Sequence, residues 1–224
     1  QYELCLNVLR RLRTAGVLPR LILIGSWCLA VYRQYFKDVG TIDAVRTRDM
    51  DFLVPPNAAR TPRIDIPELL ADLGFITGIR GEQGNMIIEH PELLIEFLVP
   101  ERGRGSTGPL DLPSLGVNAQ PLRFMDVAMM MTVQLSFEDV PVTVPHPAAF
   151  ALHKLLVAPR RRTVEKRRKD VDAALMVLNL LEQKHETHLV KALFDKFPRP
   201  WKKRIVELLA TEDHGALAAQ LAGH

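Results

Sequence analysis

The hydrophobic pattern of the sequence changes near Pro145, and this change limits the folds that the chain can form. Before this point, short apolar runs alternate with segments of helical periodicity, separated by Gly and Pro residues. After it, the pattern is helical almost throughout. The sequence therefore predicts two domains, an α/β domain over residues 1–145 and an all-helical domain over residues 146–224.

Periodicity and turn residues also predict the individual elements of both parts. Residues 101–116 are rich in Gly and Pro at their start and are expected to form a loop. In the first part we expect helices over 2–15, 27–36 and 66–73, and strands over 21–24, 50–54, 86–88, 93–99, 120–124, 131–137 and 140–144. In the second part we expect helices over 148–157, 164–183, 186–196, 200–211 and 215–222.

Composition excludes several classes of protein. The chain has 29 Lys and Arg against 26 Asp and Glu, so its net charge of +3 does not make the whole protein a polycation. Uncharged stretches such as Leu21–Tyr32 are far shorter than the about 20 residues of a membrane span, so no membrane association is expected. Cys5 and Cys28 lack CxxC spacing, which argues against a disulfide scaffold or a cysteine zinc site and favours a location in the cytoplasm.

Because residue 1 is Gln, we expect the sequence to be part of a longer product.

A short apolar strand, residues 21–24, ends in Gly25-Ser26 and is followed by an expected helix. A glycine lets the backbone approach a bound group closely, and a helix N-terminus presents N–H groups that attract anions. The Ser26 hydroxyl adds a further donor. This strand–turn–helix unit is therefore a candidate phosphate site.

Three carboxylates lie in otherwise apolar strands. Asp49 and Asp51 are two residues apart on one strand, so their side chains project from the same face, whereas Met50 between them points into the core. Two neighbouring carboxylates repel each other, so both stay ionised most easily when a cation lies between them. Glu96 lies in a second apolar strand, where an unpaired carboxylate is costly. Carboxylate oxygens are ligands that suit Mg²⁺ or Mn²⁺. A third carboxylate beside the Asp pair would complete a two-metal site for in-line displacement at phosphorus.

Each of these features also has a plain structural interpretation. A Gly-Ser turn after a strand is common, and Glu96 can lie on the solvent face of a half-buried strand. The Asp-x-Asp pair can be a solvated strand face, or the metal bridge of a glycosyltransferase to a nucleotide-sugar. The order of the three features along the chain favours a common site for a nucleotide and a metal.

With Gly25-Ser26, Asp49-x-Asp51 and Glu96 in this order, the sequence resembles the nucleotidyltransferase superfamily, with the DNA polymerase β-like fold. The segments 120–126, 144–147 and 153–156 resemble a largely uncharacterised bacterial nucleotidyltransferase-like family. The resemblance covers about residues 20 to 180. It implies an α+β fold, a mixed sheet flanked by helices and followed by an all-helical C-terminal domain. One departure is the long gap before Asp49, which includes the charged, insertion-like segment 37–46.

The resemblance also implies roles for individual residues. Gly25 and Ser26 would hold the nucleotide phosphates, and Asp49, Asp51 and Glu96 would be catalytic and would ligate the metal, although Asp is more usual than Glu at the third position. Lys154 lies in a nearly all-apolar helix. It either extends to the surface, as long cationic side chains do, or reaches the phosphates, as a lysine in the helical part of the superfamily often does.

Seven cations lie between Arg160 and Lys169, opposed only by Glu165. Such a run is often just a solvated helix face. Here it lies near a helix N-terminus, where the helix dipole disfavours cations, so a bound anion would offset their repulsion. The candidate residues for binding a polyanion such as RNA are Arg161, Arg162, Arg167 and Arg168.

The sequence therefore favours a metal-dependent nucleotidyltransferase. Such an enzyme binds an NTP, moves the nucleoside monophosphate to an acceptor hydroxyl and releases pyrophosphate. The acceptor, the base preference and the oligomeric state are not specified by the sequence. Two alternatives stay open at this point: a non-catalytic nucleotide- or RNA-binding module that retains the fold, and a glycosyltransferase.

Overall fold

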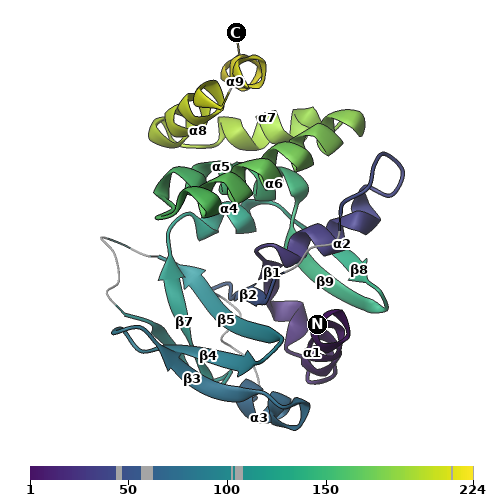
Figure 1. Cartoon of the computed structure of the whole chain (residues 1–224), viewed down its shortest axis with the longest axis vertical. Coiled ribbons are helices and arrows are strands. Elements are labelled where there is room, and N and C mark those ends of the chain that lie inside the picture. The colour runs from purple at the N-terminus through teal and green to yellow at the C-terminus, as the bar shows by residue number, and fades with distance from the viewer. Residues whose placement is uncertain (44–46, 57–62, 102, 104–107, 213, 224) are drawn as a thin grey trace. The chain divides into compact units, whose positions relative to one another are not determined.

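The computed structural model describes residues 1–43, 47–56, 63–101, 103, 108–212 and 214–223. The insertion-like segment 37–46 and the expected loop 101–116 therefore lie partly outside the described residues. The chain divides into two compact units (Figure 1). The first contains residues 1–37, 41–126 and 133–145, and the second contains residues 38–40, 127–132 and 146–224.

The first unit is built on a mixed sheet. Its strands lie in the order β1-β2-β5-β4-β3, with β7 paired to β5 and β6 paired to β7. Strands β2, β5 and β7 are parallel to one another, whereas β1 is antiparallel to β2 and β4 is antiparallel to both β5 and β3. The bounds are Ile22–Ile24 (β1), Asp49–Leu53 (β2), Ile76–Arg80 (β3), Asn85–His90 (β4), Leu93–Pro100 (β5), Leu110–Leu112 (β6) and Val117–Leu122 (β7).

Helices and a hairpin complete this unit. They are α1 (Tyr2–Thr14), α2 (Trp27–Tyr35), α3 (Ile66–Leu70), and the hairpin of β8 (Thr132–Phe137) and β9 (Val140–Pro145). Trp27 and Tyr32 of α2 are buried, as expected of core residues, and the Tyr32 hydroxyl donates a hydrogen bond to the carbonyl of Pro145. Cys5 and Cys28 are buried free thiols.

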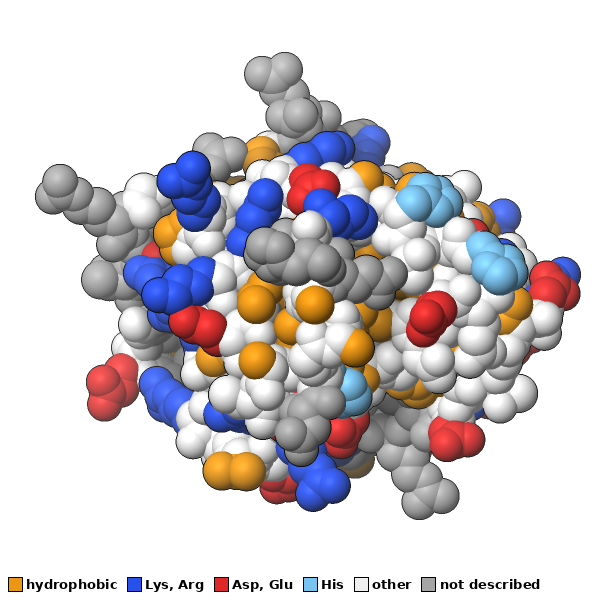
Figure 2. Space-filling model, turned by 90° about the horizontal axis from the view of Figure 1, so that it is seen from above, with side chains coloured by type: hydrophobic (Ala, Val, Ile, Leu, Met, Phe, Trp, Pro, Cys, Tyr) orange, Lys and Arg blue, Asp and Glu red, His pale blue; other side chains and the backbone are white. Residues whose placement is uncertain are grey.

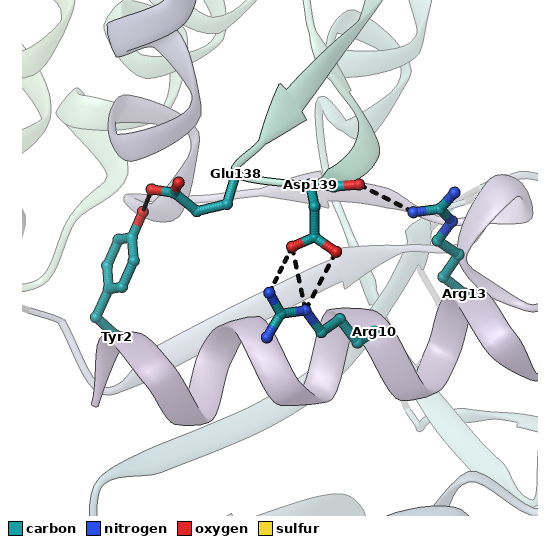
Figure 3. A network of polar contacts seen from close by, with 5 residues as sticks. All are labelled: Tyr2, Arg10, Arg13, Glu138 and Asp139. Atoms are coloured by element: carbon teal, nitrogen blue, oxygen red, sulfur yellow. Dashed lines mark hydrogen bonds and ion pairs between the residues drawn. The ribbon is translucent and has the colours of Figure 1, made fainter.

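Polar contacts join α1 to the turn of the β8–β9 hairpin (Figure 3). Arg10 donates two hydrogen bonds to one carboxylate oxygen of Asp139, and Arg13 donates to the Asp139 carbonyl. The Tyr2 hydroxyl donates to Glu138 at 2.6 Å, and burial together with this contact raises the pKa of Tyr2 to about 12. These contacts fix the first helix against the hairpin, more than 125 residues further along the chain.

The second unit is helical in its long C-terminal part. Its helices are α5 (Pro147–Val157), α6 (Val164–Gln183), α7 (Thr187–Asp195), α8 (Arg199–Thr211) and α9 (Gly215–Ala222). One apolar stripe of α6 is buried at Val171, Ala174, Leu178 and Leu181 and half-buried at Leu175. None of the helices in the described ranges is long and apolar enough to cross a membrane.

The structure confirms the α+β class with a mixed sheet and a helical C-terminal part, and most expected elements agree within a few residues. Within the described residues, two strands and one α-helix were missed. Strand β3 is an edge strand exposed on both faces, so it lacks the alternation that predicts a half-buried strand. Strand β6 lies in the segment expected to be a loop, and α4 (Met125–Met130) is too short for its periodicity to be recognised.

Candidate active site

The three predicted carboxylates lie on neighbouring parallel strands of the first unit. Strand β2 pairs with β5 so that Asp51 is opposite Glu96 and Asp49 is opposite Leu94. Met50 and Phe52 are fully buried, whereas Asp49 is exposed and Asp51 is half-buried, so the two aspartates share the other face of the strand. Because paired residues of adjacent strands project from the same face, Glu96 lies on the face of Asp49 and Asp51.

The Gly25 turn packs directly against this face. Strand β1 places Ile24 opposite Asp51, and Gly25 follows with a φ of +75°, a conformation that favours glycine. A Cβ at Gly25 would lie 2.6 Å from Oδ2 of Asp51, which is closer than any normal contact. Only a residue without a side chain therefore fits beside the Asp51 carboxylate in this backbone conformation.

Ser26 is the N-cap residue of α2, but its hydroxyl makes no capping hydrogen bond. The first turn of a helix has N–H groups without intrahelical partners and a partial positive charge. Since Gly25 contacts Asp51 and Ser26 follows it, this helix end lies close to the carboxylate face. The arrangement offers anion-binding N–H groups and cation-binding oxygens side by side.

The donor chemistry of these residues fits a hard divalent cation, because carboxylate oxygens are the ligands that Mg²⁺ and Mn²⁺ prefer. In the part of the chain that the structure describes, no three His, Cys, Asp or Glu side chains are gathered closely enough to hold a metal ion. The convergence of Asp49, Asp51 and Glu96 on one metal stays a prediction.

Lys154 lies in the second unit, where it is buried and paired. Its Nζ is 2.5 Å from Oδ1 of Asp170, and Arg161 donates to the other oxygen of the same carboxylate. Burial alone would raise the pKa of Asp170, but the two cations lower it below its ordinary value. The neighbouring ring of His153 has a buried Nε2 that finds no hydrogen-bond partner among the described residues. Burial and then Lys154 lower the pKa of His153 to about 3.

The side chain of Lys154 therefore neither extends into solvent nor stands unpaired, and the structure gives it a role in the helical core. Its contact with nucleotide phosphates stays a prediction. Helical spacing places Lys166 and Arg167 one turn from Asp170 on the same helix, within reach of an ion pair. The structure instead pairs Asp170 with Lys154 and Arg161. The one available signal was that Asp170 falls on the apolar stripe of α6, where a carboxylate needs a cation.

We expect Asp170→Asn to destabilise the protein by about 3–5 kcal/mol, because it leaves the buried ammonium of Lys154 uncompensated. Chemical denaturation followed by circular dichroism measures this change. Asp172→Asn removes the same charge from an exposed site on the same helix, where Asp172 lies 3.8 Å from Arg168. This control should lose no more than about 1 kcal/mol, and equal losses in both variants would contradict the structural role of the buried pair.

The basic run separates into paired and unpaired side chains. Besides Arg161, the paired residues are Arg167, which contacts Glu212 at 2.7 Å, and Arg168, which makes the longer contact with Asp172. Three further cations of the run are exposed and have no ion-pair partner within the described residues: Arg162, Lys166 and Lys169.

A family model described as Nucleotidyltransferase matches residues 3–197. The chain belongs to this nucleotidyltransferase family. The match extends over both the carboxylate strands and most of the helical unit, so it includes every candidate site residue. No curated protein sequence matches the chain.

Solved structures of nucleotidyltransferases show similar folds. A nucleotidyltransferase-like antigenic protein from Paracoccidioides brasiliensis matches with a TM-score of 0.53 at 13% identity, covering 98% of this chain and 93% of that one. The solution structure of the antibiotic-resistance factor ANT(2'')-Ia matches with a TM-score of 0.51 at 14% identity, covering 96% of this chain and 97% of that one. At these identities the likeness shows the nucleotidyltransferase fold alone.

Proposed function

We propose that the chain transfers a nucleoside monophosphate from an NTP to an acceptor hydroxyl, releases pyrophosphate and depends on Mg²⁺ or Mn²⁺. The observation that carries the proposal is the contact between two separate motifs. Gly25 packs on the Asp51 carboxylate, and Asp51 is opposite Glu96 in the sheet. The Gly25 turn and the carboxylate strands are therefore neighbours, which supports a common site for a nucleotide and a metal.

In this site, Asp49, Asp51 and Glu96 would hold the metal. When bound, the metal would neutralise phosphate charge and stabilise the charge that develops during displacement at phosphorus. The turn at Gly25 and Ser26 binds and orients the triphosphate through backbone N–H groups at the start of α2. Most of the rate enhancement would come from this positioning and from charge stabilisation.

The proposed transfer is a single displacement at the α-phosphorus of the NTP. The acceptor oxygen forms a bond to the α-phosphorus, and the bond from that phosphorus to the bridging oxygen of pyrophosphate breaks. A carboxylate oxygen of Glu96 accepts the proton of the acceptor hydroxyl. Pyrophosphate leaves with the electron pair of the broken bond.

In the direct test, the full chain is incubated with each α-labelled NTP and with Mg²⁺ or Mn²⁺. Total RNA, protein and hydroxyl-bearing small molecules are then supplied in turn as acceptors. We expect label in one acceptor class and an equal amount of pyrophosphate. NTP binding that needs no metal and gives no turnover with any acceptor would instead support a non-catalytic nucleotide-binding module.

A polynucleotide acceptor is the one that the basic run favours, because an extended anion can contact several of its cations. Arg161 and Arg167 hold structural pairs, so a test must avoid them. We expect combined Gln substitution of Arg162, Lys166 and Lys169 to weaken RNA binding and flatten its salt dependence. On a single strand, each phosphate contact contributes about 0.7 to the slope of log binding constant against log salt concentration, so loss of three contacts should lower the slope by about 2.

A matched triple variant controls for net charge. Substitution of Lys196, Arg199 and Lys203 by Gln removes the same amount of positive charge from exposed positions elsewhere in the helical unit. RNA affinity measured by fluorescence anisotropy over a range of salt should keep the parental slope in this control. Equal slopes in the parent and both triple variants would show that the run is a solvated helix face, and a small-molecule or protein acceptor would then be favoured.

A further inference from the structure

The helical unit contains a cavity that no part of the proposed transfer chemistry uses. It has a volume of about 780 Å³ and lies between α6, α7 and α9. Binding sites for small molecules commonly have volumes of about 300–1,000 Å³ and apolar walls with a few polar groups. The walls of this cavity are mainly apolar, formed by Leu175, Met176, Leu178, Val190, Leu217 and Leu221.

The polar side of the cavity is suited to a cation. Glu182 is the one carboxylate among the described lining residues, and no ion pair involves it within the described residues. It lies in the last turn of α6, which carries no basic residue. The C-terminal end of a helix has a partial negative charge and stabilises a cation, so the helix dipole adds to the attraction of Glu182.

Two titratable lining groups, Lys191 and His188, have polar partners of their own. The ammonium of Lys191 lies 2.6 Å from both carboxylate oxygens of Asp195, an acid that also lies 4.0 Å from Lys202, so part of the charge of Lys191 is compensated. Nδ1 of His188 lies 3.2 Å from the carbonyl oxygen of His185. Since a carbonyl only accepts, Nδ1 carries the proton in the neutral ring and Nε2 is an acceptor.

We propose that this cavity binds an organic cation with an apolar body. The ammonium group of the ligand contacts Glu182, and its apolar part packs against the leucines of α6 and α9. The face drawn in Figure 2, seen from the end at which α8 and α9 lie in Figure 1, carries exposed hydrophobic side chains between charged and histidine side chains.

Cation binding at this cavity is independent of the proposed nucleotidyl transfer. It concerns residues of the helical unit alone, and it is tested by binding without an NTP or a metal. Failure of cation binding would leave the transfer proposal unaffected, and absence of transfer would leave the cavity proposal unaffected.

The test uses three probes with the same apolar body: 4-phenylbutylamine, 4-phenylbutanol and 4-phenylbutyrate. Their dissociation constants for the full chain are measured by NMR titration. We expect the amine to bind about tenfold or more tightly than the butyrate, with the alcohol between them, because only the amine forms a charge-assisted hydrogen bond with Glu182. Equal or tighter binding of the butyrate would overturn the proposed preference for a cation.

Two pairs of variants assign the binding to this cavity. Glu182→Gln should reduce the affinity for the amine about tenfold and leave the alcohol unchanged, whereas Glu207→Gln, an exposed acid on α8, should change neither. Ala216→Phe adds a ring at a lining position, and should weaken all three probes at least about tenfold by filling the cavity. Ala219→Phe adds the same ring to an exposed position of α9 outside the lining and should have no effect. Unchanged amine binding in Ala216→Phe would overturn the assignment of the site.

Discussion

Asp51→Asn is expected to abolish metal-dependent NTP binding and to lower the rate of transfer by at least about a hundredfold. Mutation of a residue that only supports a metal ligand can already lower activity by that factor. The amide keeps the size of the side chain but removes the charge that attracts a divalent cation. Asp51 is the most informative position, since it lies opposite Glu96 and in contact with the Gly25 turn. Titration of NTP with and without Mg²⁺, together with a pyrophosphate-release assay, measures both effects.

The same substitution should leave the folded state intact. Removing one of several like charges on one strand face relieves repulsion, so the melting temperature of Asp51→Asn should equal or exceed that of the parent. Asp111→Asn is the matched control, because Asp111 is an exposed aspartate on strand β6 of the same unit. A variant at Asp51 that retains full metal-dependent turnover would exclude the carboxylate face as the catalytic site.

The strands that carry the candidate site were predictable because each is a compact apolar run. Asp49 and Asp51 interrupt such a run with period two, and the buried Met50 and Phe52 show the alternation that the pattern predicted. The register of Asp51 against Glu96 was not predictable in the same way. It depends on β2 pairing with β5 on the side away from β1, and not with β3 or β4, which follow β2 sooner in the sequence, and the order of strands in a sheet is set by tertiary packing.

Other parts of the fold escaped sequence reasoning for a different reason. Strand β3 is held by its pairing with β4, while Ile76 and Ile79 remain 69% and 63% exposed, so no buried face produced a periodic pattern. The partner of Lys154 also could not be identified from local spacing, because Asp170 is 16 residues away on another helix. In both cases the decisive contact is between elements, whereas periodicity describes single elements.

Gly25→Ala is expected to block NTP binding by two effects that act at the same point. A φ of +75° disfavours any residue with a Cβ, at a cost of roughly 1–2 kcal/mol. In addition, the new methyl group would lie 2.6 Å from Oδ2 of Asp51, so either the carboxylate or the turn must move. Both movements disturb the proposed site, because one displaces a proposed metal ligand and the other displaces the N–H groups proposed to bind phosphate.

Gly81→Ala separates the two effects. Gly81 has a φ of +69° in the turn between β3 and β4, but a Cβ there meets no atom within 4 Å. This control should therefore show the backbone cost as a loss of stability and keep the parental affinity for NTP. We expect Gly25→Ala to lose NTP binding, whereas Ser26→Ala should weaken it by only about 1.5–3 kcal/mol, the value of one hydrogen bond to a charged group. If calorimetry gave Gly25→Ala the same NTP affinity as Gly81→Ala, the contact between this turn and Asp51 would have no part in nucleotide binding.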